Sequence, residues 1–496
     1  MLMLNGSLLR WATASRRLTR SVLMSFLVFA AACRDVSQLG TGPDAAVAHA
    51  ARPDIRAGAS GASIVLRGTI ITPTDIIQHG YIGIVNGRIV SISERQPDLS
   101  NAIVLNTEGI ILPGFVDVHN HLPWNALPRW TPPHRYANRR EWQSDPIFQQ
   151  QVRAPFKALI GDGDITGQGP ICDMNAYSEL RALVGGVTSI LTTHPVPCIH
   201  GLVRNLDFNS GFYGTTELDR EHIATALEIP PPDSLTARAM FVALAKGAIR
   251  SPRFEALFLH VSEGIDPASL EEFTFGQSQG LLNPKGVVIH GIALGPSQFQ
   301  AMATSGVSLV WSPRSNITLY GRTVDITSAL DAGVRVALAP DWAISGSSNM
   351  LDELHFADEW NRTQLGGRLT DRHLVDMVTS IPAREAGIDD EVGAIREGLR
   401  ADILIIRGAR NDPLRAVIEA NPADVRLVLI EGVPLYGDWS AMRSFWSAGD
   451  LDEIPVSHEP KALARAASGF VFSDVVARLV LAFSAAGVSL SPLTGR

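Results

Sequence analysis

Four apolar runs that lie far apart in the chain each lead into a histidine or an aspartate, and this arrangement constrains the fold most strongly. The runs lead into His119, His260, His290 and Asp341. Amphipathic stretches of helical length separate them. Near-continuous apolar strands that alternate with helices are typical of a parallel sheet covered on both faces. The carboxyl ends of parallel strands share one side of the sheet, so we expect these four side chains to converge.

The alternation predicts an α/β fold in which residues 114–387 form a TIM-like (β/α) barrel. The length of 496 residues and the 46% of hydrophobic residues fit a large globular protein and exclude a disordered or multi-span membrane protein. The interval between the strand expected at 187–192 and His260 is short for two full βα units. We therefore expect the third and fourth barrel strands to be short or irregular.

Short strands with alternating polarity flank the barrel on both sides in the sequence. We expect segments 62–113 and 388–440 to combine into one small β-sandwich. Asn86-Gly87 between two such strands is a strong hairpin signal. Residues 441–496 are interpreted as a C-terminal tail that packs on the barrel, because the apolar stretch at 473–486 is too short to span a membrane.

Residues 1–33 have the pattern of a signal peptide. Four arginines and no acidic residue accompany an apolar run at 21–32, which is too short for a membrane span. Ala30-Ala31-Ala32-Cys33 resembles a bacterial lipoprotein processing site, in which Cys33 is lipidated. We expect an exported protein of the bacterial periplasm or cell envelope, with residues 34–61 as a tether. Signal cleavage without lipid and a cytoplasmic protein with a misassigned start are the alternatives.

The other two cysteines, Cys172 and Cys198, form an isolated pair. In an oxidising compartment such a pair usually bonds, so we predict a disulfide between them. Two reduced and buried thiols are the alternative. The formal net charge of −8 makes nucleic acid an unsuitable partner, because phosphate binding requires a basic face. We expect a small-molecule substrate, a membrane contact only through the lipid anchor, and possible assembly into a homo-oligomer.

His119 and His121 stand two residues apart on an extended segment, so both imidazoles point to the same side, as two ligands of one metal require. Glu263 follows His260 by three residues, where it could move protons. The alternative interpretation has His260 and His290 as core histidines and Glu263 as a solvated residue.

The motifs around these residues occur in an order that resembles the amidohydrolase superfamily. The resemblance is to the branch that contains cytosine, guanine and chlorotriazine deaminases and imidazolonepropionase, and it covers roughly residues 62–440. It is carried by Pro113-Gly114-Phe115-Val116-Asp117-Val118-His119-Asn120-His121, His260-Val261-Ser262-Glu263, Val288-Ile289-His290, Ser312-Pro313-Arg314-Ser315-Asn316 and Ala339-Pro340-Asp341.

The resemblance implies that His119, His121, His260 and Asp341 hold one divalent metal, Zn²⁺ with Fe²⁺ as the alternative. Glu263 would act as general base and then general acid, His290 would hydrogen-bond the hydroxide or the oxyanion, and Asp341 would also accept a proton. The implied activity is hydrolysis of a non-peptide carbon–nitrogen bond in a small molecule.

Two rival functions remain open. The first is a binuclear amidase, dipeptidase or lactonase of the same superfamily. One metal is favoured over two, because Lys246, the nearest candidate for a bridging lysine, lies in a stretch with helical spacing. The second rival is a catalytically silent solute-binding lipoprotein, which would not need Glu263.

Six residues are candidates for the substrate pocket. Two are tryptophans that could form the walls, three lie in the segment 192–207, and one lies in the loop after a strand. Packing at the barrel mouth or bracing of the loop is the alternative role. The six are Trp124, Trp311, His194, His200, Arg204 and Asn316.

A lipid-labelling experiment tests the predicted anchor. Replacing Cys33 by Ser should abolish incorporation of a radiolabelled lipid precursor, because the acylated thiol is removed. The Cys172→Ser protein is the matched control and should stay labelled. Persistent labelling of Cys33→Ser would show that the anchor lies elsewhere.

Overall fold

The computed structural model describes residues 63–161, 170–192, 202–206, 224–250, 255–409, 411–456, 459–469 and 471–494. The expected signal peptide and tether therefore lie outside the described residues, as do Cys33, His194, Cys198 and His200. None of the helices in the described ranges is long and apolar enough to cross a membrane.

Eight parallel strands build the centre of the molecule in two sheets, which confirms an α/β fold with parallel sheets. The first sheet has the order β5-β6-β7 and the second the order β12-β11-β10-β9-β8. Between them a parallel bridge joins Asn120 to Asp341. Closure of the two sheets into one barrel stays a prediction. The strands are β5 (Phe115–Asn120), β6 (Val187–Thr192), β7 (Arg204–Asn205), β8 (Ala224–Glu228), β9 (Leu257–Val261), β10 (Gly286–His290), β11 (Ser308–Trp311) and β12 (Val336–Leu338).

Helices between these strands begin at sequence signals. Asp266 caps α8 by accepting a hydrogen bond from the Ser269 N–H, and Pro267 occupies the first turn. The helices are η2 (Leu122–Ala126), α3 (Arg139–Ser144), α4 (Pro146–Phe148), η3 (Gln149–Arg153), α5 (Ala154–Ile160), α6 (Pro170–Val184), α7 (Leu235–Arg250), α8 (Pro267–Ser278), α9 (Pro296–Ser305), α10 (Pro313–Tyr320), α11 (Ile326–Asp331), α12 (Met350–Gln364), α13 (Asp371–Asp376) and α14 (Ser380–Glu385). Lys246 lies within α7, as its helical spacing predicts.

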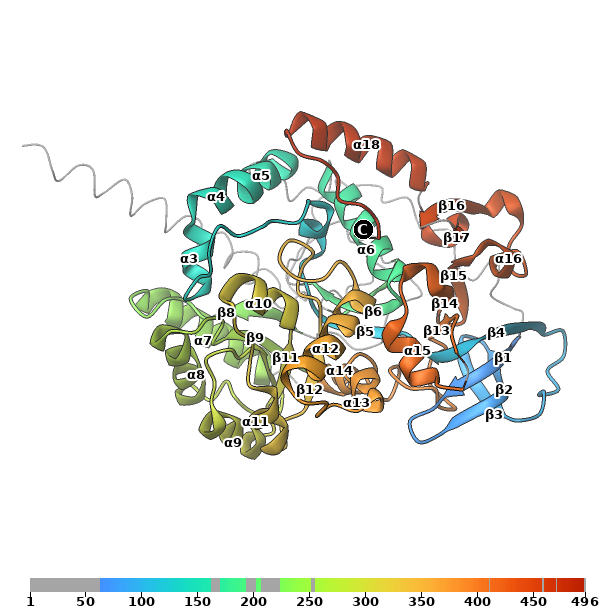
Figure 1. Cartoon of the computed structure of the whole chain (residues 1–496), viewed down its shortest axis with the longest axis horizontal. Coiled ribbons are helices and arrows are strands. Elements are labelled where there is room, and N and C mark those ends of the chain that lie inside the picture. The colour runs from blue at the N-terminus through green and yellow to red at the C-terminus, as the bar shows by residue number, and fades with distance from the viewer. Residues whose placement is uncertain are drawn as a thin grey trace, which may run out of the picture.

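The flanking segments pair in one nine-stranded sheet. Antiparallel pairing of β4 with β13 joins the N-terminal strands to the C-terminal ones, and Figure 1 shows them side by side. The predicted hairpin at Asn86-Gly87 connects β2 to β3, with φ of 50° and 75° at the two turn residues. The order is β16 (Leu451–Val456), β17 (Glu459–Ala464), β15 (Val433–Asp438), β14 (Val425–Ile430), β13 (Ile403–Ile406), β4 (Ile103–Pro113), β1 (Ile64–Ile71), β2 (Ile76–Val85) and β3 (Arg88–Ser93).

A sandwich of two layers stays a prediction, because the described flanking strands pair in this single sheet. Short helices connect or follow its C-terminal strands. They are α15 (Pro413–Glu419), η5 (Pro422–Asp424), α16 (Trp439–Met442), η6 (Ala448–Asp450) and α17 (Arg465–Ser468). One cluster of buried apolar residues extends from this sheet to the parallel strands, and a second cluster contains alternate residues of those strands, such as Val116, Phe258 and Ile289.

The C-terminal segment 441–496 differs from the expected tail on the barrel. Its first half forms β16 and β17, which extend the nine-stranded sheet. The amine of Lys461 on β17 is buried and donates to Asp438 Oδ1 at 2.6 Å, so this strand is fixed by a charge pair. Buried Ile454 and Val456 alternate with exposed neighbours, a period-two pattern that indicates a strand.

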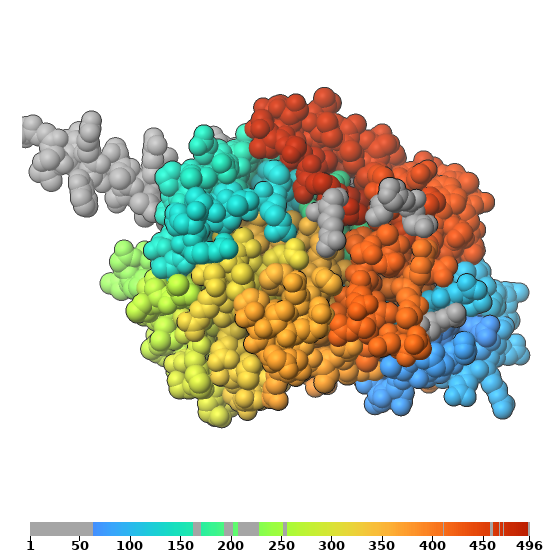
Figure 2. All heavy atoms as spheres, viewed as in Figure 1, coloured from blue at the N-terminus to red at the C-terminus, as the bar shows by residue number. Residues whose placement is uncertain are grey.

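The second half of that segment packs on helices that lie between parallel strands β5 and β6. Helix α18 (Phe472–Ala485) contacts α6 and α5, and Arg478 pairs with Asp173 on α6. Figure 2 shows the red surface of α18 beside the cyan surface of α3 to α5. The C-terminal helix therefore covers the element that precedes β6.

Arg204 joins the parallel strand β7 to the nine-stranded sheet. Its guanidinium is buried, donates to both carboxylate oxygens of Asp402, and reaches Glu431 Oε1 at 3.1 Å. Arg204 is not among the residues that line the cavity described below. The structure thus places this predicted pocket residue in a structural ion-pair network.

Replacing Arg204 by Leu should lower the free energy of unfolding by about 3–5 kcal/mol, because the buried Asp402 carboxylate loses its counter-ion. Urea denaturation followed by circular dichroism measures this as a lower midpoint. Arg384→Leu is the control, since Arg384 pairs with Asp389 on the surface and its loss should cost less than about 1 kcal/mol. Equal midpoints for the two variants would contradict the assigned role of Arg204.

Candidate active site

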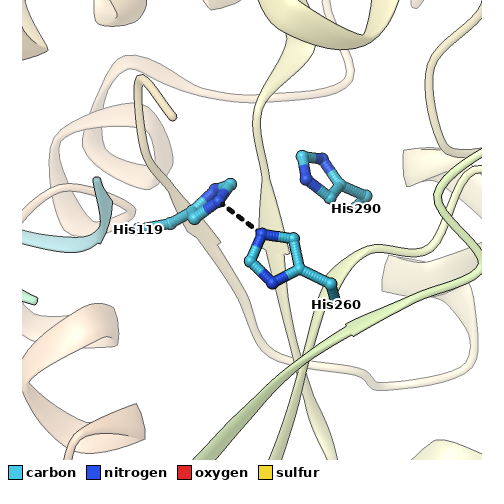
Figure 3. A group of neighbouring side chains, drawn as sticks. All are labelled: His119, His260 and His290. Carbon is cyan, nitrogen blue, oxygen red and sulfur yellow. Dashed lines mark hydrogen bonds between the residues drawn. The ribbon is translucent and has the colours of Figure 1, made fainter. Parts of the chain in front are cut away.

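The strand ends bring the predicted donors together in space. His119 lies on β5, His260 on β9 and His290 at the end of β10, and Figure 3 shows the three rings facing one another. His119 Nε2 lies 3.2 Å from His260 Nε2. Asp341 follows β12, and its Oδ1 lies 3.1 Å from His121 Nε2 and 3.4 Å from His119 Nε2. Two groups of side chains could hold a metal ion and share His119: His119 with His260 and His290, and His119 with His121 and Asp341.

This donor set fits a divalent metal ion. Four ligand atoms at about 2.0–2.1 Å from a tetrahedral Zn²⁺ would lie about 3.3 Å from one another. The pairs His119–His260, His121–Asp341 and His119–Asp341 have separations close to this value. Burial lowers the pKa of His119 well below its usual value and that of His290 to about 4. Their imidazoles are therefore neutral at physiological pH, which leaves a nitrogen lone pair available for a metal.

Hydrogen bonds from helix α10 and its N-cap orient the donors. The Nδ1 of His119 lies 3.1 Å from the hydroxyl of Ser312, which leaves Nε2 facing the other donors. The hydroxyl of Ser315 donates to Asp341 Oδ2 at 2.7 Å, so Oδ1 faces the histidines. The Ser312-to-Asn316 motif was singled out from the sequence, but the roles of its two serines were not.

His290 is oriented in the same way. Its Nδ1 donates to Asn316 Oδ1 at 2.9 Å, and its Nε2 lies 3.8 Å from Glu263 Oε2. Thr323 accepts hydrogen bonds from the Asn316 amide at 3.1 Å and from the Trp311 indole at 2.8 Å. Asn316 and Trp311, predicted as pocket residues, therefore lie behind His290 and are not among the residues that line the cavity.

The backbone is strained where two of these side chains enter the site. His290 has φ of 70° and Asp341 has φ of 67°. Positive φ is uncommon for residues other than glycine, and strain of about 1–3 kcal/mol persists only where the surroundings hold it. The contacts of the His290 and Asp341 side chains therefore hold the backbone in this strained conformation.

Glu263 lies in the loop after β9 and is buried beside the histidines. Burial raises the pKa of its carboxyl to about 8, although the nearby Arg139 and a hydrogen bond from Tyr320 act in the opposite direction. The Tyr320 hydroxyl donates to Oε1 at 2.6 Å. A carboxyl group whose pKa lies near neutrality can both accept and release a proton.

A cavity of about 550 Å³, part of it open to solvent, leads to these groups. Its floor consists of His121, His260, Glu263, His290 and Asp341, and aromatic rings form much of its wall. Trp124 was predicted for this wall, and Trp142, Phe148 and Trp342 were not. The remaining lining residues are Gln143, Arg153 and Glu228.

The three aromatic residues of the cavity wall that were not predicted lie close in sequence to predicted site residues. Trp142 and Phe148 lie in the segment directly after the HxH motif, which is rich in tryptophan. Trp342 directly follows Asp341, and its ring centroid lies 5.5 Å from those of Trp142 and His121. Aromatic faces at these distances present an apolar, flat surface to a ligand.

Cys172 on α6 is disulfide-bonded in the structure. The partner that the sequence predicts, Cys198, lies outside the described residues. The pairing of these two cysteines therefore stays a prediction.

The fold and the donor set fit a metal-dependent hydrolase. Residues 261–435 match the sequence model described as the Amidohydrolase family. This match confirms the resemblance, and the chain is an enzyme of amidohydrolase type.

A curated relative and two solved structures extend this result. The 5-methylthioadenosine/S-adenosylhomocysteine deaminase of Caldicellulosiruptor saccharolyticus is 24% identical over 76% of this chain and 93% of its own length. An atrazine chlorohydrolase from Arthrobacter aurescens, crystallised with zinc, has a TM-score of 0.59 at 19% identity over 75% of this chain and 95% of its own. Escherichia coli guanine deaminase has a TM-score of 0.58 at 18% identity, over 75% and 99%.

Metal analysis of variants tests the donor set. His119→Ala and His260→Ala should each lower the bound metal well below that of the unaltered protein, because an imidazole ligand is lost. Elemental analysis by mass spectrometry measures the metal per chain. His355→Ala is the control, since His355 lies exposed on α12 and should not affect the metal. Unchanged stoichiometry in both site variants would refute the assignment.

Proposed function

We propose that the protein is a mononuclear, metal-dependent deaminase that hydrolyses the exocyclic carbon–nitrogen bond of a planar, amino-substituted heteroaromatic compound. The observation that carries the proposal is the position of Glu263 between the histidine cluster and an aromatic-walled cavity. The deaminase names of the relatives agree with it. Substrates of the adenine-nucleoside type are the first to test.

His119, His121, His260 and Asp341 would hold the metal, with Zn²⁺ as the preferred ion. When bound, the ion supplies Lewis acidity that lowers the pKa of water and makes a nucleophile available at neutral pH. We also propose that the two parallel sheets are the arcs of one (β/α) barrel, with the site at the carboxyl ends of its strands. Export and lipid anchoring through Cys33 remain part of the proposal.

The remaining steps belong to the side chains. Glu263 accepts a proton from the attacking water as the carbon–oxygen bond forms, and it donates this proton to the amino nitrogen as the carbon–nitrogen bond breaks. One water is consumed and ammonia is released. His290, neutral and held by Asn316 through its Nδ1–H, presents the lone pair of Nε2 to the site and orients the attacking water by accepting a hydrogen bond from it.

The aromatic wall would bind the ring of the substrate. The centroid of the Trp342 ring lies 5.7 Å from that of Trp124, so the two indoles present faces at an angle to one another. Such faces favour a flat ring over a flexible peptide chain. The exposed Arg153 and Glu228 at the cavity would meet polar substituents of the ring.

Glu263→Gln tests this mechanism. The amide keeps the shape of the side chain but cannot take up and return the proton, so turnover should fall by about 100-fold or more. Ammonia release from a panel that includes 5-methylthioadenosine, adenosine and guanine measures the activity. Metal content should stay unchanged, and loss of metal instead would move Glu263 into the ligand set. Turnover equal to that of the unaltered protein would overturn the proposed function.

A further inference from the structure

A chain of two hydrogen bonds connects the cavity wall to Glu263. The indole Nε1 of Trp142 donates to the Tyr320 hydroxyl at 2.8 Å, and this hydroxyl donates to Glu263 Oε1 at 2.6 Å. All three side chains are buried. Trp142 and Glu263 line the cavity, whereas Tyr320 lies behind them.

The direction of this chain is fixed by chemistry. An indole N–H can only donate, so the oxygen of Tyr320 must accept from Trp142. The single hydroxyl proton of Tyr320 then points at Glu263. A hydroxyl that donates to a carboxylate forms a short, strong bond, and rotation of this proton away from Glu263 would break it.

The two oxygens of Glu263 consequently have different surroundings. Oε1 is occupied by Tyr320, whereas Oε2 faces His290 Nε2 at 3.8 Å and Arg139 Nη1 at 4.0 Å. Oε2 is therefore the oxygen left to face the reacting atoms. A carboxylate that moves a proton needs such a fixed orientation, because small misplacements reduce rates strongly.

The segment that carries Trp142 also holds the loop of Glu263. The N–H of Arg139 donates to the Glu263 carbonyl at 3.2 Å, and the N–H of Ile265 donates to the Ala137 carbonyl at 2.7 Å. The side chain of Arg139 is anchored by Glu272 at 2.9 Å. One segment thus supplies both the cavity wall and the backbone contacts of the catalytic loop.

We infer that Tyr320 and Trp142 are positioning residues for Glu263, and that Trp142 couples the substrate wall to the orientation of this carboxylate. The inference rests on the proposed function. Tyr320 does not line the cavity, so its replacement should affect the chemical step and not substrate binding. Trp142 affects both the chemical step, through its N–H, and binding, through its ring.

Steady-state kinetics of three variants test the inference on the compound of the panel that is turned over fastest. Tyr320→Phe should lower kcat by about 10- to 100-fold with KM changed less than about twofold, because only the orientation of Glu263 is lost. Trp142→Phe keeps a ring in the wall and should lower kcat by about 3- to 10-fold, the factor of one neutral hydrogen bond. The double variant should have the kcat of Tyr320→Phe, because both changes break one chain.

Trp124→Phe is the matched control. It also replaces an indole in the cavity wall. Its effect on kcat should multiply with that of Tyr320→Phe, because within the described residues the Tyr320 hydroxyl bonds to Trp142 and Glu263 and not to Trp124. Equal metal content and equal thermal midpoints across the variants would show that each folds. Unaltered kcat in Tyr320→Phe, or multiplying effects of Tyr320→Phe and Trp142→Phe, would overturn the inference.

The outcomes distinguish the positioning role of Tyr320 from the proposed function. An inactive Glu263→Gln with a fully active Tyr320→Phe would refute the positioning role but leave the proposed function standing. An active Glu263→Gln, or no turnover of any panel compound, would refute both. If Tyr320→Phe fails to fold, the non-additivity is tested instead between Trp142→Phe and Glu263→Asp, which shortens the same carboxylate.

Discussion

Close packing of titratable side chains in a buried site is the constraint on which the rest of this structure depends. The Nε2 atom of His119 lies 3.2 Å from His260 Nε2 and 3.4 Å from Asp341 Oδ1, and all three side chains are almost fully buried. Such a cluster cannot carry several like charges in a medium of low dielectric constant. Burial keeps the imidazoles of His119 and His290 neutral, and a divalent cation would balance the nearby carboxylates.

A single short helix maintains this packing. Helix α10 and its N-cap contribute Ser312, Ser315, Asn316 and Tyr320, which contact His119, Asp341, His290 and Glu263 respectively. Ser312, Asn316 and Tyr320 recur every four residues and therefore share one face of the helix. A displacement of α10 would change the orientation of all four side chains together.

The strand ends could be predicted from the sequence, because an apolar run followed by a histidine or aspartate is a local pattern. The hydrogen-bond chain to Glu263 could not, since its links join residues 178 and 57 positions apart. The ion pair of Arg204 could not be predicted for the same reason, since its partner Asp402 lies 198 residues away. Strand β16 has a period-two pattern, but the pairing that makes β16 and β17 part of the sheet depends on β15.

The most direct test of the central claim is the position of the metal in a crystal of the metal-loaded protein, located by anomalous scattering at the zinc edge. We expect one ion per chain within about 2.0–2.2 Å of donor atoms of His119, His121, His260 and Asp341. An ion bound elsewhere, or no anomalous peak between these four side chains at full occupancy of metal, would contradict the account.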